Sequence, residues 1–218
     1  MNYFRIIFFS IITLTVGGHL ALADEMDAVL ESVQKQYDKT RTFKARFTQK
    51  SYLKIMDQTQ EAQGEVIIKK PGKMKWVYRA PDPQILISNE KGIWLYLPEE
   101  KQVTKMAMEN IYAANTPALF LVGEGKLRDS FKVDQVLKKD KTLTLVLIPS
   151  DKGMNIDRLF LFVEHKSYQI IGSTVYDNLG NETEILFSDI QVNLDLSDDL
   201  FEFKIPDGVD LIDFSEKP

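Results

Sequence analysis

Cysteine is missing from the whole sequence of 218 residues. A chain without cysteine has no disulfide scaffold, so burial and hydrogen bonding must stabilise its fold. The absence also excludes thiol catalysis, zinc–thiolate sites and the acylated cysteine of a lipid-anchored bacterial lipoprotein. Any function must therefore come from other side chains.

Runs of basic residues are missing as well. The chain has 27 Lys and Arg residues against 32 Asp and Glu residues, a formal net charge of −5. A surface this acidic argues against nucleic acid and against lasting attachment to anionic lipid. We expect no nucleic-acid partner and no stable membrane insertion.

Catalytic motifs are absent too. The sequence contains no G-x-S-x-G, H-E-x-x-H or P-loop pattern, and its acidic and histidine residues show no metal-ligand spacing. His165 lies in a polar stretch typical of a turn, and the adjacent Asp198 and Asp199 are typical of a solvated loop. We therefore predict no catalytic residue, no metal and no cofactor, which means a protein that is not an enzyme.

One long apolar stretch is present, at the N-terminus. Residues 1–23 carry a single charge, Arg5, then an apolar run from Ile6 to Leu14, and end in Ala21-Leu22-Ala23. This pattern predicts a cleaved secretory signal peptide. The alternative is an uncleaved anchor, for which the run is short.

Cleavage after Ala23 would leave residues 24–218, with 26 basic and 32 acidic side chains and a net charge of −6. This length can bury a substantial core. No internal repeat, low-complexity tract or long linker divides it. We predict one domain over 24–218.

Hydrophobic periodicity predicts the secondary structure. A helix is expected over 24–40, because apolar residues fall on one face there: Met26, Val29, Leu30, Val33 and Tyr37. Alternation with period two then predicts strands around 43–48, 66–69, 74–79, 85–87, 94–96, 131–136, 142–148, 156–163, 169–176, 182–190 and 201–205. Helical segments over 109–114 and 116–122 separate the two strand blocks. The fold class is α+β, a strongly curved antiparallel sheet with helices over one face, and the helices either complete the core or roof a cavity.

Two aromatic pairs stand out. Trp76 and Tyr78 share one strand face because they are two residues apart, and Trp94 and Tyr96 repeat the spacing one hairpin later. Such rings either pack in a core or line an apolar ligand cavity. The residues alone leave both interpretations open.

The order of several short motifs resembles the periplasmic outer-membrane lipoprotein carrier family (LolA-type). The resemblance runs from about residue 26 to 212. The matching residues are Phe47-Thr48-Gln49, residues 64–70, Pro71, Trp76, Pro81, Ile87-Ser88, Trp94, Tyr96, Asn115-Thr116-Pro117 and the stretch Phe201–Val209.

The resemblance implies a fold and a task. The fold is a strongly curved, incomplete antiparallel β-barrel with helices forming a lid over an apolar cavity. The task is to take acylated lipoproteins from an inner-membrane ABC transporter, shield their acyl chains across the periplasm and pass them to an outer-membrane lipoprotein receptor. A monomer is expected.

The same resemblance implies the site residues. The acyl-chain cavity would be lined by Phe47, Val66, Ile68, Met74, Trp76, Tyr78, Ile87, Trp94, Tyr96, Leu119 and Phe120. The family commonly has an Arg before the position of Pro71, which holds the lid closed through helix carbonyls. This sequence has Lys70 there, a compact charge without the planar fork of Arg. Lys70 is either the lid latch or a solvated lysine.

Two alternatives come from other functional classes. One is a periplasmic lipid- or lipoprotein-binding sensor module without a transport role, which would need a second partner domain. The other is a secreted enzyme that uses carboxylates together with His165. Replacement of His165 by Ala without effect would remove the second alternative.

Overall fold

The computed structural model describes residues 17–107, 126–151 and 153–215. These residues form a twelve-stranded sheet, a long helix α1 (Gly17–Lys39), a short helix α3 (Leu127–Ser130) and the 3-10 turn η2 (Asp198–Phe201). The helix predicted over 24–40 is confirmed, although α1 begins upstream at Gly17. Within the described part of the chain, no helix is both long and apolar enough to cross a membrane.

The strands follow the two predicted blocks. They are β1 (Thr42–Leu53), β2 (Gln58–Lys69), β3 (Lys73–Ala80), β4 (Gln84–Asn89), β5 (Gly92–Leu97), β6 (Gln102–Met106), β7 (Phe131–Lys139), β8 (Thr142–Pro149), β9 (Arg158–Glu164), β10 (Ile170–Tyr176), β11 (Glu182–Val192) and β12 (Asp210–Phe214). The helices predicted over 109–114 and 116–122 lie outside the described residues.

The C-terminal strand prediction is wrong in its position. Residues 201–205 form no strand; η2 ends at Phe201, and the strand of this region is β12, farther along the chain. The alternation of Phe201 and Phe203 has another cause. Phe201 is buried and Phe203 contacts Trp94, so both rings pack on the sheet while their backbone pairs with no strand.

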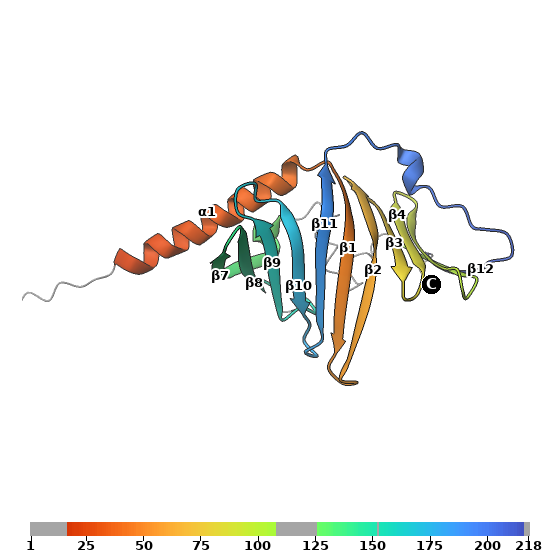
Figure 1. The fold of residues 1–218 in the computed structure, drawn as a ribbon, viewed down its shortest axis with the longest axis horizontal. Coiled ribbons are helices and arrows are strands. Elements are labelled where there is room, and N and C mark those ends of the chain that lie inside the picture. The colour runs from red at the N-terminus through yellow and green to blue at the C-terminus, as the bar shows by residue number, and fades with distance from the viewer. Residues whose placement is uncertain (1–16, 108–125, 152, 216–218) are drawn as a thin grey trace, which may run out of the picture.

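The sheet is open. Its strand order is β12-β6-β5-β4-β3-β2-β1-β11-β10-β9-β8-β7, with β12 and β7 at the two edges. Neighbouring strands are antiparallel except β12 and β6, which are parallel. Figure 1 shows the strands fanning through a strong curve, with α1 against the β7–β10 side. The prediction of a curved α+β sheet that does not close is confirmed.

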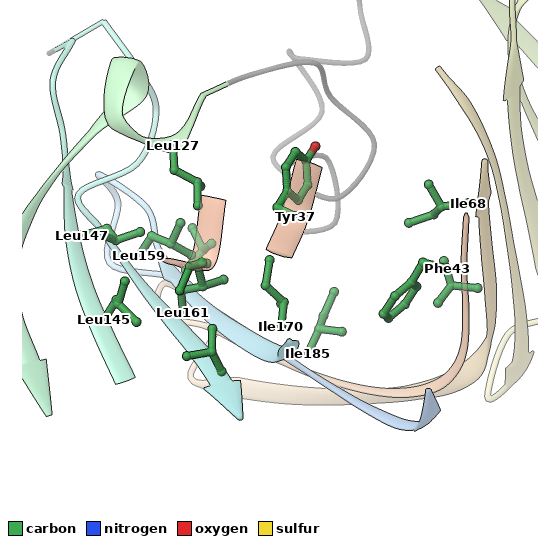
Figure 2. Packing of buried hydrophobic residues seen from close by; sticks show 14 of the residues in the cluster. Tyr37, Phe43, Ile68, Leu127, Leu145, Leu147, Leu159, Leu161, Ile170 and Ile185 are labelled. Atoms are coloured by element: carbon green, nitrogen blue, oxygen red, sulfur yellow. The ribbon is translucent and has the colours of Figure 1, made fainter. Parts of the chain in front are cut away.

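The main core fills the concave face of this curve. In β1, Phe43, Ala45 and Phe47 are buried while the residues between them are exposed. Figure 2 shows aliphatic side chains of β8–β11 and side chains of β1 and β2 directed toward one interior, with Tyr37 of α1 above them. Each fully buried Leu, Ile or Phe contributes about 1.5–3 kcal/mol to folding, so this face accounts for most of the burial.

The convex face is covered on one half of the sheet by the segment that follows β11, residues 193–209, here called the C-terminal strap. Asn89 donates from Nδ2 to the Phe201 carbonyl at 2.8 Å. Asp198 lies 2.6 Å from Lys69 Nζ and 2.9 Å from Lys73 Nζ. The strap therefore binds to β2, β3 and β4 before the chain pairs with β6 as β12.

Candidate functional site

An aromatic cluster lies on the concave face of β1, β3 and β11. The Phe47 ring is 4.8 Å from Trp76 and 4.9 Å from Tyr78, both in edge-on geometry. Phe187 completes the cluster at 6.3 Å from Trp76. These rings form a continuous apolar wall at the centre of the curve.

Strand register explains why Phe47 can lie between these rings. Gly64 of β2 is opposite both Phe47 of β1 and Tyr78 of β3. A Cβ atom at Gly64 would lie 2.9 Å from the Phe47 ring and 2.0 Å from the Val77 carbonyl oxygen. The missing side chain thus leaves the space that Phe47 occupies.

The remaining predicted residues of β2 and β3 lie on the same face. Val66, Ile68 and Met74 are each at most 1% exposed. Val66 is opposite Trp76, and Ile68 is opposite Met74. Six predicted cavity residues are therefore brought together on one side of the sheet: Phe47, Val66, Ile68, Met74, Trp76 and Tyr78.

The register puts Ile87, Trp94 and Tyr96 on the opposite, convex face. Trp76 is opposite Leu86, and Leu86 is opposite Leu95, so Trp94 points the other way. Trp94 and Tyr96 instead lie 6.4 Å and 5.9 Å from Phe203 of the strap. The prediction that Ile87, Trp94 and Tyr96 line one cavity with Trp76 is therefore wrong. The sheet face that each aromatic pair occupies depends on the length of the turns between the strands. A shift of one residue in the strand register moves every side chain to the other face.

Two predicted residues cannot be placed. Leu119 and Phe120, and the expected lid segment over 116–122, lie outside the described residues.

Lys70 directly follows β2, and its side chain reaches α1. Its ammonium donates to the Tyr37 carbonyl at 2.6 Å and lies 3.0 Å above the centre of the Tyr37 ring. Tyr37 belongs to the last turn of α1, where carbonyl groups carry the negative end of the helix dipole. Both contacts favour a cation at this position.

Burial and a nearby carboxylate shift the pKa of Lys70 in opposite directions. Burial lowers the pKa of its ammonium to about 8, and the negative charge of Asp38 acts in the opposite direction. Lys70 is therefore mostly protonated at pH 7. A charged donor in a half-buried place makes a stronger hydrogen bond than a neutral one.

Helix α1 is held more firmly on its other side. Leu30 and Val33 are buried in the core. Gln34 Oε1 accepts from the Leu127 amide at 2.7 Å, and Gln36 Nε2 donates to Gln169 Oε1 at 3.3 Å. Apolar packing and amide contacts thus fix α1 to the β7–β10 side, whereas Lys70 connects it to β2.

A small cavity remains between α1 and the sheet beside Lys70. It measures about 20 Å³ and is lined partly by Tyr37, Phe43, Ile68 and Ile170. This volume accommodates about one water molecule and no acyl chain. The described conformation is therefore closed at this point, and α1 would have to move for a large apolar ligand to contact Phe43 and Ile68.

The polar groups within the aromatic cluster are not equipped for acid–base chemistry. Tyr78 donates from its hydroxyl to Gln49 Oε1 at 3.1 Å, and burial raises the pKa of Tyr78 to about 12. Trp76 Nε1 is buried and has no hydrogen-bond partner among the described residues. Across the same residues, no group of His, Cys, Asp and Glu is arranged to hold a metal ion. His165 lies in a turn, apart from this cluster.

The sequence analysis missed two contributors to this site. Phe187 joins the cluster from β11, and Tyr37 supplies both the carbonyl and the ring that meet Lys70. The alternation of Ile185 and Phe187 was a usable signal, since both lie on one face of a predicted strand. The Tyr37 carbonyl carries no sequence signal.

Comparisons with known proteins identify the family. The family model described as outer membrane lipoprotein carrier protein LolA matches residues 38–204. The outer-membrane lipoprotein carrier proteins of Azotobacter vinelandii and Pseudomonas aeruginosa (strain UCBPP-PA14) are 32% and 33% identical to this chain over 213 residues. Each alignment covers 97% of this chain and 99% of the relative.

The fold is also found among solved structures. An uncharacterized conserved protein from Thermus thermophilus aligns with a TM-score of 0.56, covering 87% of this chain and 99% of that one, at 11% identity. That likeness concerns the fold alone. Family-model match, near-complete coverage and identity above 30% together show that this chain belongs to the outer membrane lipoprotein carrier family.

Proposed function

We propose that the protein carries acylated lipoproteins across the periplasm and shields their acyl chains on the concave face of its sheet. The observation that carries this proposal is an apolar concave face that carries an aromatic cluster and is bordered by a helix that Lys70 joins to β2. Membership in the carrier family supplies the ligand class.

The energetics of the task suit a face of this kind. Burial of an acyl chain is worth about 0.8 kcal/mol per CH₂, so two or three long chains hold a lipoprotein in a bilayer by tens of kcal/mol as an upper estimate. A soluble carrier must offer comparable apolar area. Here that area includes Phe47, Trp76 and Tyr78, with Phe43 and Ile68 closest to α1.

Lys70 is the latch in this proposal. In the described conformation its ammonium donates to the Tyr37 carbonyl and keeps α1 against β2. Loading exchanges contacts between α1 and the sheet for contacts between acyl chains and the sheet. Closure would then favour release of the cargo, because the latch forms again only when the acyl chains have left.

The partners follow from the energetics. The sequence has no nucleotide-binding motif, so the energy that extracts a lipoprotein from the membrane would come from an inner-membrane ABC transporter. An outer-membrane receptor would accept the cargo. Residues 1–23 would direct export to the periplasm and would then be cleaved, and the carrier would act as a monomer.

The central test is release of lipoproteins from spheroplasts. Purified protein added to spheroplasts should release outer-membrane-directed lipoproteins into the medium as soluble complexes. In a second assay, a hydrophobic fluorescent probe should bind the empty protein, and acylated lipoprotein should displace it. Equal displacement by the same lipoprotein without its acyl chains would contradict the proposal.

A further inference from the structure

A basic groove is lined by residues from the end of α1, the adjoining ends of β1 and β2, and the start of the strap. Figure 1 shows these segments together at one end of the sheet. Lys39, Arg41, Thr42, Lys69 and Lys70 line one side, and residues 193–196 line the other. We call it the Lys39–Arg41 groove. It is separate from the concave core, although Arg41, Thr42 and Lys70 border both the groove and the small cavity beneath α1.

Hydrogen bonds fix the groove wall in place. The backbone amide of Asn193 donates to the Thr42 carbonyl at 2.9 Å, and its side-chain Oδ1 accepts from the Arg41 backbone amide at 2.8 Å. The Thr42 hydroxyl donates to the Leu194 carbonyl at 2.8 Å, and Lys69 Nζ donates to the Leu196 carbonyl at 2.6 Å. The groove is therefore preformed.

The charge of the groove is opposite to that of the whole chain. Four cations line it against one carboxylate, Asp195, whereas the chain carries a net charge of −5. Lys69 is paired with Asp198. Within the described residues, the exposed side chains of Lys39 and Arg41 form no ion pair. Two cations in a preformed groove are thus available to an external anion.

We propose that the Lys39–Arg41 groove binds an acidic segment of a partner protein, and that this segment draws Lys70 away from the Tyr37 carbonyl. Lys70 can serve as the connection because it borders the groove on one side and meets α1 on the other. A carboxylate is a better acceptor for an ammonium than a peptide carbonyl. The inference rests on the proposed carrier function, since it gives the latch an external trigger.

The lining of the groove favours a protein segment over a membrane surface. The cations line an open groove that also includes Leu194 and Leu196, so an extended chain with both acidic and apolar side chains matches the lining better than lipid headgroups alone. The net negative charge of the remaining surface repels anionic lipid. An acidic peptide therefore fits both the lining and the charge.

Binding is tested with a fluorescently labelled peptide, Leu-Glu-Glu-Leu, and its uncharged counterpart Leu-Gln-Gln-Leu. The acidic peptide should bind the full-length protein more tightly, and its binding should weaken as salt is raised. The double variant Lys39→Gln, Arg41→Gln should bind it about tenfold more weakly, the loss expected for two exposed ion pairs. The control variant Lys132→Gln, Lys139→Gln removes two exposed lysines from β7 and should bind like the parent.

Coupling to the latch is tested by uptake of a hydrophobic fluorescent probe. The acidic peptide should speed probe uptake by the parent. It should still bind Lys70→Met through Lys39 and Arg41 but no longer speed its uptake. Any of three results would overturn the proposal. The two peptides could bind the parent equally well, the Lys39/Arg41 variant could bind the acidic peptide as tightly as the parent, or the peptide could still speed probe uptake in Lys70→Met.

Two further arms separate this inference from its alternatives. Any binding of the protein to vesicles containing phosphatidylglycerol should be independent of Lys39 and Arg41. Vesicle binding that is lost in the Lys39/Arg41 variant would identify a membrane, and not an acidic peptide, as the partner of the groove. Release of lipoprotein from spheroplasts by the parent, together with absence of any peptide effect, would remove the groove inference alone. Peptide binding without lipoprotein release would instead refute the carrier function.

Discussion

The two halves of the sheet are built differently. In the half from β7 to β11, the concave face is mainly aliphatic, with Leu145, Leu147, Leu159, Leu161 and Ile185 at most 3% exposed, and Phe187 of β11 lies at its border with β1. In the half from β1 to β6, the concave face carries Phe47, Trp76 and Tyr78. The convex faces differ too. The strap packs Phe201 and Phe203 on the β1–β6 half, whereas Leu186 on the other half is 42% exposed.

This difference separates a fixed core from a surface that can exchange partners. Helix α1 is bound to the aliphatic half by buried side chains and by Gln34 and Gln36, but it meets β2 through Lys70. If α1 moves, we therefore expect it to separate from the aromatic half (β1–β6) and to stay attached to the aliphatic half (β7–β11). The aromatic half can lose that contact without unfolding because the strap supports it from behind.

The largest expected effect is in the aliphatic half. Leu159→Ala removes a fully buried side chain and should lower the free energy of unfolding by about 3 kcal/mol, measured by urea denaturation. Leu186→Ala, on the convex face of the same half, should cost less than about 0.5 kcal/mol. Similar losses for both variants would show that this half is not a fixed core.

A second effect concerns the contact between α1 and β2. Lys70→Leu removes a charged hydrogen bond worth about 1.5–3 kcal/mol when shielded and adds apolar surface. The variant should accept lipoprotein normally but deliver it more than about tenfold more slowly, so that loaded carrier accumulates. Lys70→Arg should deliver at least as well as the parent. Delivery by Lys70→Leu at the parental rate would identify Lys70 as a solvated lysine.

A third, smaller effect distinguishes the two faces of the aromatic half. Phe203→Ala removes the ring that contacts Trp94 and Tyr96 on the convex face. It should lower the free energy of unfolding by about 1 kcal/mol and leave the affinity for a hydrophobic probe unchanged. Tyr78→Ala, on the concave face, should weaken probe binding. Weaker probe binding in Phe203→Ala would mean that the convex face takes part in the site.

The smallest effect is the pH dependence at Lys70. Burial lowers its pKa to about 8, so above that pH the folded protein loses a proton that the unfolded chain keeps until about pH 10.4. The stability of the parent relative to Lys70→Met should therefore rise from pH 7 to pH 10. A constant or falling difference would mean that the Tyr37 contacts outweigh burial.

The local pattern of the sequence predicted most of the fold but not its long-range pairing. The alternation in Phe43, Ala45 and Phe47 identified both the strand and its buried face. Trp94 and Tyr96 have the same alternation, yet their face is set by the register across β3, β4 and β5. β12 gave no signal because all five of its residues are exposed, and its partner β6 lies far away in the sequence.

The candidate site, like the fold, was predictable where it depends on local pattern and not where it depends on long-range contacts. Val66, Ile68 and Met74 were predictable because their strands are adjacent in sequence and in space. The position of Lys70 came from the family resemblance, but its acceptor is a main-chain oxygen that any residue at position 37 would offer. Side-chain patterns cannot predict such a partner, because it depends on where the last turn of α1 meets β2.

The pairing of β1 with β11 bears on how the chain folds. Within β1–β6 and within β7–β11, each strand pairs with its neighbour in sequence, so each block can form by local hairpins. The β1–β11 seam joins residues as distant as Phe43 and Val192, and its closure carries the entropy of a long loop. Phe187 meets Phe43 and Trp76 only across this seam. The aromatic cluster is therefore expected to form late in folding, so a newly made chain would complete this part of its concave face only when the whole sheet has formed.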